Sequence, residues 1–327
     1  MEPALAKASS KHNPRLIETP LIHQPMIPRR PIAHSSPNFS SMVYGTWRML
    51  DDGSSIQDIN RRLQRCQELG ITTIDTAEIY GLYTVEEALG KALAISPGLR
   101  DKLEIVTKSG IYVPHDGCLD RKVGFYDASE AQIKRSVENS LRLLGTDYVD
   151  LFLVHRPDWL TGVDDTAAGL NELLASGKIR SAGVSNYNSA QVSALNSRMD
   201  QPLVTNQVEF HLLRMAPTTD GTFDQCQEQR FQPMAWSPLA GGRLFDPTND
   251  AAQRLTKAVA ALAPKYDNAT LEQFAYAWIM AHPSRPIPVI GTNKIKRIES
   301  AAKAASLKLD REDWYALWVA ANGYNIP

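Results

Sequence analysis

Four side chains with acid–base chemistry stand at, or one turn beyond, the ends of short apolar segments in this chain of 327 residues. They are Asp75, Tyr80, Lys108 and His155. Three of them each close a run rich in β-branched and other apolar residues, and Tyr80 follows Asp75 across one turn. If these runs are neighbouring parallel strands, a carboxylate, a phenol, an amine and an imidazole meet at one edge of a sheet. Such a cluster predicts a site of proton transfer.

The residue types suggest a role for each member of this cluster. A phenol with an ordinary pKa near ~10 holds its proton at neutral pH. A lysine beside it stabilises the phenolate and is expected to lower the pKa of the tyrosine. We therefore predict that Tyr80 protonates a carbonyl oxygen and that Asp75 fixes Lys108. His155 can orient the carbonyl or share the proton. No protein side chain supplies hydride, so this reaction requires a cofactor.

Strand-like and helix-like segments alternate from about residue 40 to the end of the chain, and apolar residues at three- and four-residue spacing indicate the helices. Strands are predicted at 41–45, 71–75, 103–108, 148–155, 179–184, 203–208, 231–236 and 287–290. Helices are predicted after them at 56–69, 84–95, 129–144, 164–176, 188–197, 219–229, 270–281 and 294–305, with a last helix at about 310–321.

This alternation predicts an α/β protein, a single (β/α)8 TIM barrel over residues 39–327. The strands lack alternation with period two, which is typical of a sheet covered on both faces. No GxGxxG motif occurs, which disfavours a Rossmann fold. Two long connections, Ser109–Asp127 and Ser237–Asn268, follow strand ends, where barrel enzymes keep their sites. We expect long functional loops at the C-terminal face of the barrel.

Composition narrows the class of protein. The 35 basic and 36 acidic residues nearly cancel, which argues against nucleic acid or a membrane surface as a partner. Three cysteines without CxxC spacing indicate reduced thiols, no metal site and a cytoplasmic location. Residues 1–38 lack the apolar core of a secretion signal and predict a flexible or irregular arm. Alternating apolar residues from Arg15 to Ile32 leave open a hairpin, which the prolines there make irregular.

Several short motifs occur in one order along the chain and resemble those of the aldo-keto reductase superfamily. They are Gly45-Thr46-Trp47, the run from Thr73 to Gly81, Ile105–Lys108, Leu153–Pro157, Gly183–Asn186, Asn206-Gln207 and Trp236–Leu239. The resemblance extends from residue 40 to about 320, and residues 234–245 are similar to the bacterial YdhF-like oxidoreductase branch.

The resemblance implies a barrel that binds NAD(P)H without a Rossmann domain. Ser185, Asn186 and Gln207 would hold the nicotinamide carboxamide, and Trp236 would stack on the ring. Arg297, which follows Gly291-Thr292 at the start of a predicted helix, would bind the 2′-phosphate that only NADPH carries. It therefore favours NADPH, with NADH possible. The positions assigned to the cofactor are Gly45, Thr46, Trp47, Asp75, Ser185, Asn186, Gln207, Trp236, Ser237, Pro238, Leu239, Ala240, Gly241, Arg243, Gly291, Thr292 and Arg297. Those assigned to the substrate, in an aromatic and mostly apolar pocket, are Trp47, Tyr80, His155 and Trp159.

The expected function is NADPH-dependent reduction of aldehyde or ketone carbonyls to alcohols, with Tyr80 as general acid. The expected partner is a small carbonyl compound, and the expected assembly is a monomer or a small homo-oligomer. One alternative is a regulatory subunit that binds the cofactor with little turnover. Another is a Schiff-base aldolase with Lys108 as the nucleophile, which leaves the Ser185-Asn186 and Trp236–Leu239 motifs unexplained.

Overall fold

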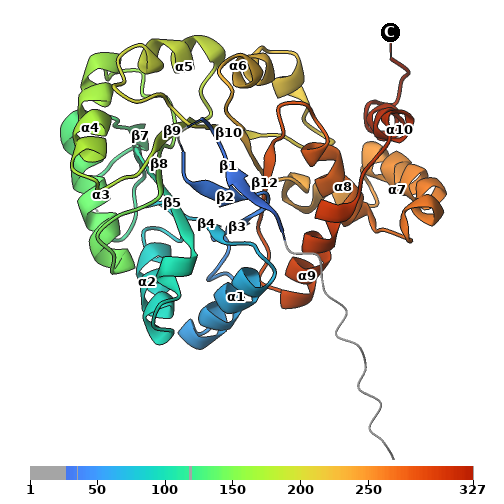
Figure 1. The fold of residues 1–327 in the computed structure, drawn as a ribbon, viewed down its shortest axis with the longest axis horizontal. Helices are drawn as coiled ribbons and strands as arrows, with labels where there is room; N and C mark the ends of the chain where they lie inside the picture. Colours follow the sequence, from blue (N-terminus) through green and yellow to red (C-terminus); the bar gives the residue numbers. More distant parts are fainter. Residues whose placement is uncertain (1–26, 35, 118–119, 327) are drawn as a thin grey trace, which may run out of the picture.

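The computed structural model describes residues 27–34, 36–117 and 120–326, and its centre is a closed barrel of eight parallel strands (Figure 1). The order around the barrel is β10-β11-β12-β3-β4-β5-β8-β9. The strands are β3 (Val43–Gly45), β4 (Thr73–Asp75), β5 (Glu104–Ser109), β8 (Leu151–Val154), β9 (Ala182–Ser185), β10 (Asn206–Glu209), β11 (Met234–Trp236) and β12 (Ile287–Ile290). The predicted (β/α)8 fold is confirmed.

Most of the helices surround the barrel and cover the outer face of its strands, while α7 and α10 lie to one side of it (Figure 1). They are α1 (Ile56–Glu68), α2 (Val85–Ile95), α3 (Glu130–Leu144), α4 (Val163–Ala175), α5 (Ser189–Asn196), α6 (Thr222–Glu228), α7 (Asp250–Leu262), α8 (Leu271–Met280), α9 (Ile295–Lys303) and α10 (Arg311–Asn322). Capping boxes begin α1, α5 and α8, each with a polar side chain on the helix amides. No helix in the described ranges is long and apolar enough to cross a membrane.

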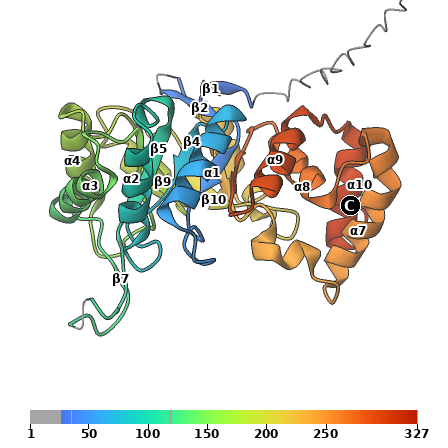
Figure 2. The same ribbon diagram turned by 90° about the horizontal axis from the view of Figure 1, so that it is seen from below.

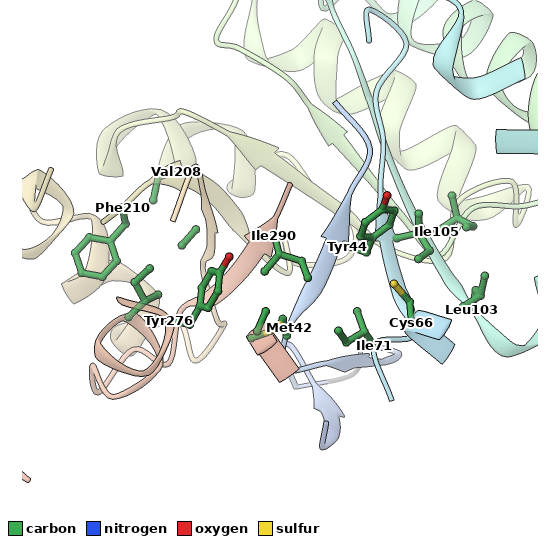
Figure 3. Packing of buried hydrophobic residues seen from close by; sticks show 14 of the residues in the cluster. Met42, Tyr44, Cys66, Ile71, Leu103, Ile105, Val208, Phe210, Tyr276 and Ile290 are labelled. Carbon is green, nitrogen blue, oxygen red and sulfur yellow. The ribbon is translucent and has the colours of Figure 1, made fainter. Parts of the chain in front are cut away.

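The apolar core has two parts. The larger lies between strands and helices and includes Tyr44, Cys66 and Ile290, which Figure 3 shows packed together. The smaller fills the barrel interior with Val43, Val106, Leu151, Leu153, Val204, Met234, Ile287 and Val289. Cys66 and Cys226 are buried free thiols, while Cys118 lies outside the described residues. Side chains therefore fill the barrel, and its open face is left to the loops.

A short hairpin lies across one end of the barrel (Figure 1). Its strands are β1 (Arg29–Pro31) and β2 (Asn38–Ser40), which pair antiparallel. Ile32 and Phe39 are each 1% exposed and join the cluster inside the barrel. Arg29 forms an ion pair with Glu104 of β5, and the Ile27 amide donates to the Leu69 carbonyl (3.0 Å).

This hairpin corrects our expectation for the inner end of the arm, which was predicted to be flexible or irregular up to residue 38. Apolar burial and the ion pair order residues 29–31 and 38–40, because the barrel supplies a surface that the local sequence does not reveal. The prolines did not prevent pairing, since the described hairpin lies at the edge of the fold. Most of the possible hairpin from Arg15 to Ile32 lies outside the described residues, as do residues 1–26.

The loops at the opposite end of the barrel carry small elements of their own. The connection after β5 contains β6 (Ile111–Tyr112) and β7 (Phe125–Tyr126), which pair antiparallel. Figure 2 shows this hairpin projecting on the side away from β1 and β2. These loops follow the carboxyl ends of the barrel strands, where we expected the functional face.

We expected the connection from Ser237 to Asn268 to be a long loop. The structure shows that it contains a helix, α7. Asn249 caps this helix, and Leu255 and Val259 are buried on one face. That face packs against α10, beside the barrel (Figures 1 and 2). The short 3-10 helices are Arg100–Lys102, Ala216–Thr218, Ala240–Phe245, Ala263–Tyr266 and Ala304–Ser306.

Candidate functional site

The four predicted acid–base residues meet at the carboxyl ends of β4, β5 and β8. Lys108 is fully buried, and its Nζ donates to Asp75 Oδ2 (2.7 Å), to the Thr76 carbonyl (2.9 Å) and to the Tyr80 hydroxyl (3.1 Å). The Tyr80 and His155 rings lie edge to face with centroids 6.0 Å apart. We refer to Asp75, Tyr80, Lys108 and His155 as the tetrad.

Neighbouring strands bring these residues together because the barrel register places their ends side by side. Asp75 pairs with Val106, two residues before Lys108, and Ser109 pairs with Val154, which precedes His155. The His155 amide donates to the Ser109 carbonyl (2.9 Å), and the Glu78 amide donates to the Lys108 carbonyl (2.9 Å). The backbone of the turn after β4 therefore fixes the approach of Tyr80 to the amine.

The net shift of the Tyr80 pKa is set mainly by burial. Burial raises the pKa of Tyr80 above its ordinary value, and the opposing effect of the Lys108 ammonium is not large enough to reverse it. Burial alone would lower the pKa of Lys108, but Asp75 and Tyr80 raise it above the ordinary lysine value. Lys108 lowers the pKa of Tyr80 as expected, but burial, which the sequence does not show, outweighs that effect and makes the net shift upward. Tyr80 keeps its proton, and Lys108 keeps its charge.

His155 is held as a neutral imidazole. Burial, followed by the charges of Lys108 and Arg156, lowers its pKa well below the ordinary value for histidine. Its Nδ1 is buried and has no hydrogen-bond partner among the described residues. A neutral ring with a free nitrogen can exchange a hydrogen bond with a bound molecule, which a protonated ring could do only as a donor.

A second group of polar side chains adjoins the tetrad at the ends of β9, β10 and β11. The Gln207 Nε2 donates to Asp75 Oδ1 (2.8 Å), and the Ser185 hydroxyl donates to the Gln207 carbonyl (2.8 Å). Asn186 has a positive φ of 62°, which asparagine tolerates better than most residues. This conformation brings its Oδ1 to the Trp236 Nε1 (3.0 Å) and its Nδ2 to the His155 carbonyl (3.2 Å).

A cleft of about 540 Å³ connects the tetrad with the loop after β12. Most positions predicted from the sequence line it, namely Gly45, Trp47, Asp75, Tyr80, His155, Ser185, Asn186, Gln207, Trp236, Ser237, Pro238, Leu239, Gly241, Gly291, Thr292 and Arg297. Gly45 has a physical requirement for glycine, because a Cβ there would lie 2.8 Å from Val289 Cγ1.

Five predicted residues do not line this cleft. Lys108 lies beneath it, and Ala240 is buried. Thr46 is buried, with its hydroxyl donating to the Asp75 carbonyl (3.0 Å). Arg243 is turned to the Ala240 carbonyl (3.0 Å) and toward Glu209. Trp159 is 83% exposed and meets Tyr126 edge to face, at a centroid separation of 5.9 Å.

Several cleft residues were not predicted as site residues. They are Arg48, Arg156, Gly242, Phe245, Glu272, Tyr276 and Val289. Arg156 lies inside the Leu153–Pro157 motif, in which only His155 was predicted as a site residue, so the charge of Arg156 was the signal that was missed. Glu272 and Tyr276 lie on α8, whose amphipathic pattern predicts core packing only. The expected pocket was mostly apolar, but the cleft contains three arginines, Arg48, Arg156 and Arg297.

The residues that line the cleft fit a nicotinamide dinucleotide. An indole and amide groups lie beside the tetrad, and Gly241, Gly242 and Gly291 leave open space where a Cβ would be. The Arg297 guanidinium is exposed and forms no hydrogen bond or close ion pair with a described residue, although its charge acts on Glu272 and Tyr276 of α8. It is therefore open to a phosphate. Within the described ranges, no group of three or more His, Cys, Asp or Glu side chains could hold a metal ion.

The comparisons with known proteins agree with this geometry. The model of the aldo/keto reductase family matches residues 41–320. The chain is 41% identical to oxidoreductase YdhF of Escherichia coli, covering 92% of this chain and 100% of the relative. It is 43% identical to 6-dehydroglucose reductase of Agrobacterium fabrum, covering 88% and 96%.

A solved structure described as an aldo/keto reductase from Klebsiella pneumoniae with NADP and acetate matches with a TM-score of 0.72 and 28% identity, covering 89% of this chain and 93% of that one. The resemblance to the superfamily and to its YdhF-like branch is thereby confirmed. The family model covers most of the sequence, and the tetrad lies at the carboxyl face of the barrel that it matches. This chain therefore belongs to the aldo/keto reductase family.

Proposed function

We propose that this oxidoreductase uses NADPH to reduce aldehyde or ketone carbonyls to alcohols, with Tyr80 as the proton donor. One observation carries the proposal. The buried chain from Asp75 through Lys108 to the Tyr80 hydroxyl opens into a cleft that continues to Arg297. A proton donor at one end and a free guanidinium at the other suit a hydride cofactor with a phosphate at its far end.

Each member of the tetrad has a role that follows from its surroundings. Tyr80 is protonated in the resting site and donates its proton as negative charge develops on the carbonyl oxygen. The Lys108 ammonium, 3.1 Å from the hydroxyl, stabilises the phenolate that this transfer leaves. Asp75 neutralises the buried ammonium and holds it in place. His155, as a neutral imidazole, hydrogen-bonds the carbonyl oxygen and orients it.

The cofactor assignments follow the lining of the cleft. When bound, NADPH supplies the hydride. Asn186 and Gln207 would hold the carboxamide beside the Trp236 indole, since their amides are fixed next to the tetrad. The backbone of residues 237–242 and Arg48 would face the pyrophosphate, and Arg297 would bind the 2′-phosphate. Arg297 is the feature that favours NADPH over NADH.

The relatives suggest where a substrate search should begin. The relative from Agrobacterium fabrum is named a 6-dehydroglucose reductase, and one from Escherichia coli that is 34% identical is named a methylglyoxal reductase. Both names denote small carbonyl compounds rich in oxygen. We propose sugar-type aldehydes and short oxo-aldehydes as the first candidates for this chain.

The proposal is tested by mixing the enzyme with NADPH and 4-nitrobenzaldehyde. Oxidation of NADPH is measured as the loss of its absorbance. The generic aldehyde reports the chemistry without requiring the natural substrate. We expect turnover with NADPH and a lower rate with NADH. Tight NADPH binding, measured by quenching of tryptophan fluorescence, without turnover on a panel of aldehydes and ketones would instead support a regulatory subunit.

A further inference from the structure

Arg156 is a charged residue of the cleft to which the proposed reaction gives no role. It directly follows His155 at the end of β8, lines the cleft and is partly buried. Its guanidinium makes no hydrogen bond or ion pair with any residue that the structure describes. A partly buried guanidinium without a partner is costly, so a bound group that accepts hydrogen bonds would be favoured there.

The barrel order places Arg156 far from the residues that suit phosphate. In the closed order, β8 is four strands from β12 in either direction, through β3, β4 and β5 or through β11, β10 and β9. The two strands therefore end on opposite sides of the barrel mouth. Gly291, Thr292 and Arg297 follow β12, so the phosphates of the cofactor belong on that side. Arg156 instead stands beside the catalytic end.

Among the residues that the structure describes, no carboxylate forms an ion pair with this guanidinium. Asp75 is engaged with Lys108 and Gln207. Asp158 is close in sequence, but its carboxylate accepts from the amides of Ala128 (3.0 Å) and Leu160 (2.9 Å) in the loop after β8. The Arg156 charge acts on the site itself, since it is one of the causes that lower the pKa of His155.

We propose that Arg156 binds oxygen atoms that the substrate carries in addition to its reacting carbonyl. The substrates are then carbonyl compounds that carry a carboxylate or hydroxyl groups within reach of the guanidinium, rather than plain alkyl aldehydes. A guanidinium donates parallel hydrogen bonds to such oxygens, and a carboxylate gains the most from its charge. This inference rests on the proposed reduction of carbonyls and adds a substrate class to it.

The test compares kcat/KM for three short aldehydes in the full-length enzyme with NADPH: succinic semialdehyde, glyceraldehyde and butanal. The first carries a carboxylate, the second hydroxyls and the third neither. We expect the wild type to prefer at least one oxygen-bearing aldehyde over butanal by about tenfold or more, because a site built for hydrogen bonding discriminates against an analogue that lacks the group. Arg156→Met should remove that preference through a higher KM and leave butanal within about threefold.

Arg142→Met is the matched control, because this arginine is exposed on α3, lies away from the cleft and hydrogen-bonds to Asn139. A loss confined to succinic semialdehyde identifies an anionic substrate, and a loss confined to glyceraldehyde identifies a sugar-type substrate. Partial rescue of succinic semialdehyde by Arg156→Lys supports a charge contact. An equal loss for all three aldehydes, or no wild-type preference, would overturn the inference. Failure of the wild type to reduce any aldehyde would instead overturn the proposed function.

Discussion

The two ends of the cleft are built differently. At the catalytic end, Asp75, Lys108 and Tyr80 form a continuous chain of hydrogen bonds, and Gln207 joins it from β10. At the phosphate end, Arg297 is exposed and makes no hydrogen bond or ion pair with a described residue. The protein completes the first end with its own contacts, whereas it offers the second end to a ligand.

The difference agrees with the roles that we propose for the two ends. A proton donor and its cation must be positioned before the substrate arrives, since reorganisation during the reaction would raise the barrier. Burying Lys108 requires a carboxylate partner, so this end is coupled to the stability of the fold. A phosphate carries its own negative charge. An exposed arginine is solvated by water, so leaving it without a protein partner costs the fold little free energy. Changes at the first end should therefore affect chemistry and folding, and changes at the second should affect binding alone.

The largest effect on the reaction is expected from Tyr80→Phe. Removing the hydroxyl deletes the proton donor and should lower kcat for carbonyl reduction by about 10³-fold, within the usual range for general acid catalysis. The phenyl ring preserves most of the packing. The Kd for NADPH, from tryptophan fluorescence, should stay within about threefold. Reduction at the wild-type rate would remove Tyr80 from the mechanism.

Lys108→Met should reveal the coupling of the catalytic end to the fold. It leaves the buried Asp75 carboxylate without its cation and should lower the free energy of unfolding by about 3–5 kcal/mol. Denaturant titration measures this change, and Asp75→Asn combined with Lys108→Met should recover part of it. Arg297→Met, at the exposed end, is the matched control and should stay within about 0.5 kcal/mol. Equal losses in the two single variants would erase the contrast between the ends.

Arg297→Ala should separate the two cofactors. Loss of the guanidinium removes a charge-assisted contact with the 2′-phosphate and should raise the Kd for NADPH about tenfold or more. NADH lacks this phosphate, so its Kd should change less than about threefold. Fluorescence titration with each cofactor measures both values. A similar loss for NADH would assign Arg297 a structural role.

The smallest effect should be that of pH. The pKa of His155 is lowered, so the ring gains a proton only well below pH 6.5, and the pKa of Tyr80 is raised, so the phenol loses its proton only above pH 10. Between these two limits His155 stays neutral and Tyr80 stays protonated. The kcat/KM for reduction should therefore be flat from about pH 6 to 9. A loss centred near pH 6.5 that His155→Gln removes would show that His155 titrates there.

The tetrad could be found from the sequence because its spacing is tied to strand ends. Asp75, Lys108 and His155 each close an apolar run, and eight alternating strands and helices leave few arrangements besides a barrel. The sign of the Tyr80 pKa shift could not be found, because it depends on the balance between burial and the Lys108 charge. That balance is set by packing from several strands.

Residues whose surroundings are formed by segments far apart in the sequence were missed or misplaced for a related reason. Arg156 followed a recognised histidine, but its lack of a partner becomes visible only when the loop turns Asp158 toward Ala128. Glu272 and Tyr276 reach the cleft from α8, a helix whose pattern indicates only packing. Trp159 was predicted to line the substrate pocket, but the loop after β8 directs it outward to Tyr126.

The sequence by itself determined the barrel, the order of its strands along the chain and the chemical types at four strand ends, since apolar periodicity and motif order are local properties. Only the tertiary structure decided which groups are buried, which charges are paired and which remain available to a ligand. Those properties depend on what neighbouring strands and loops bring to the same point in space. The Asp75–Lys108 pair and the unpaired Arg156 show both outcomes at one barrel mouth.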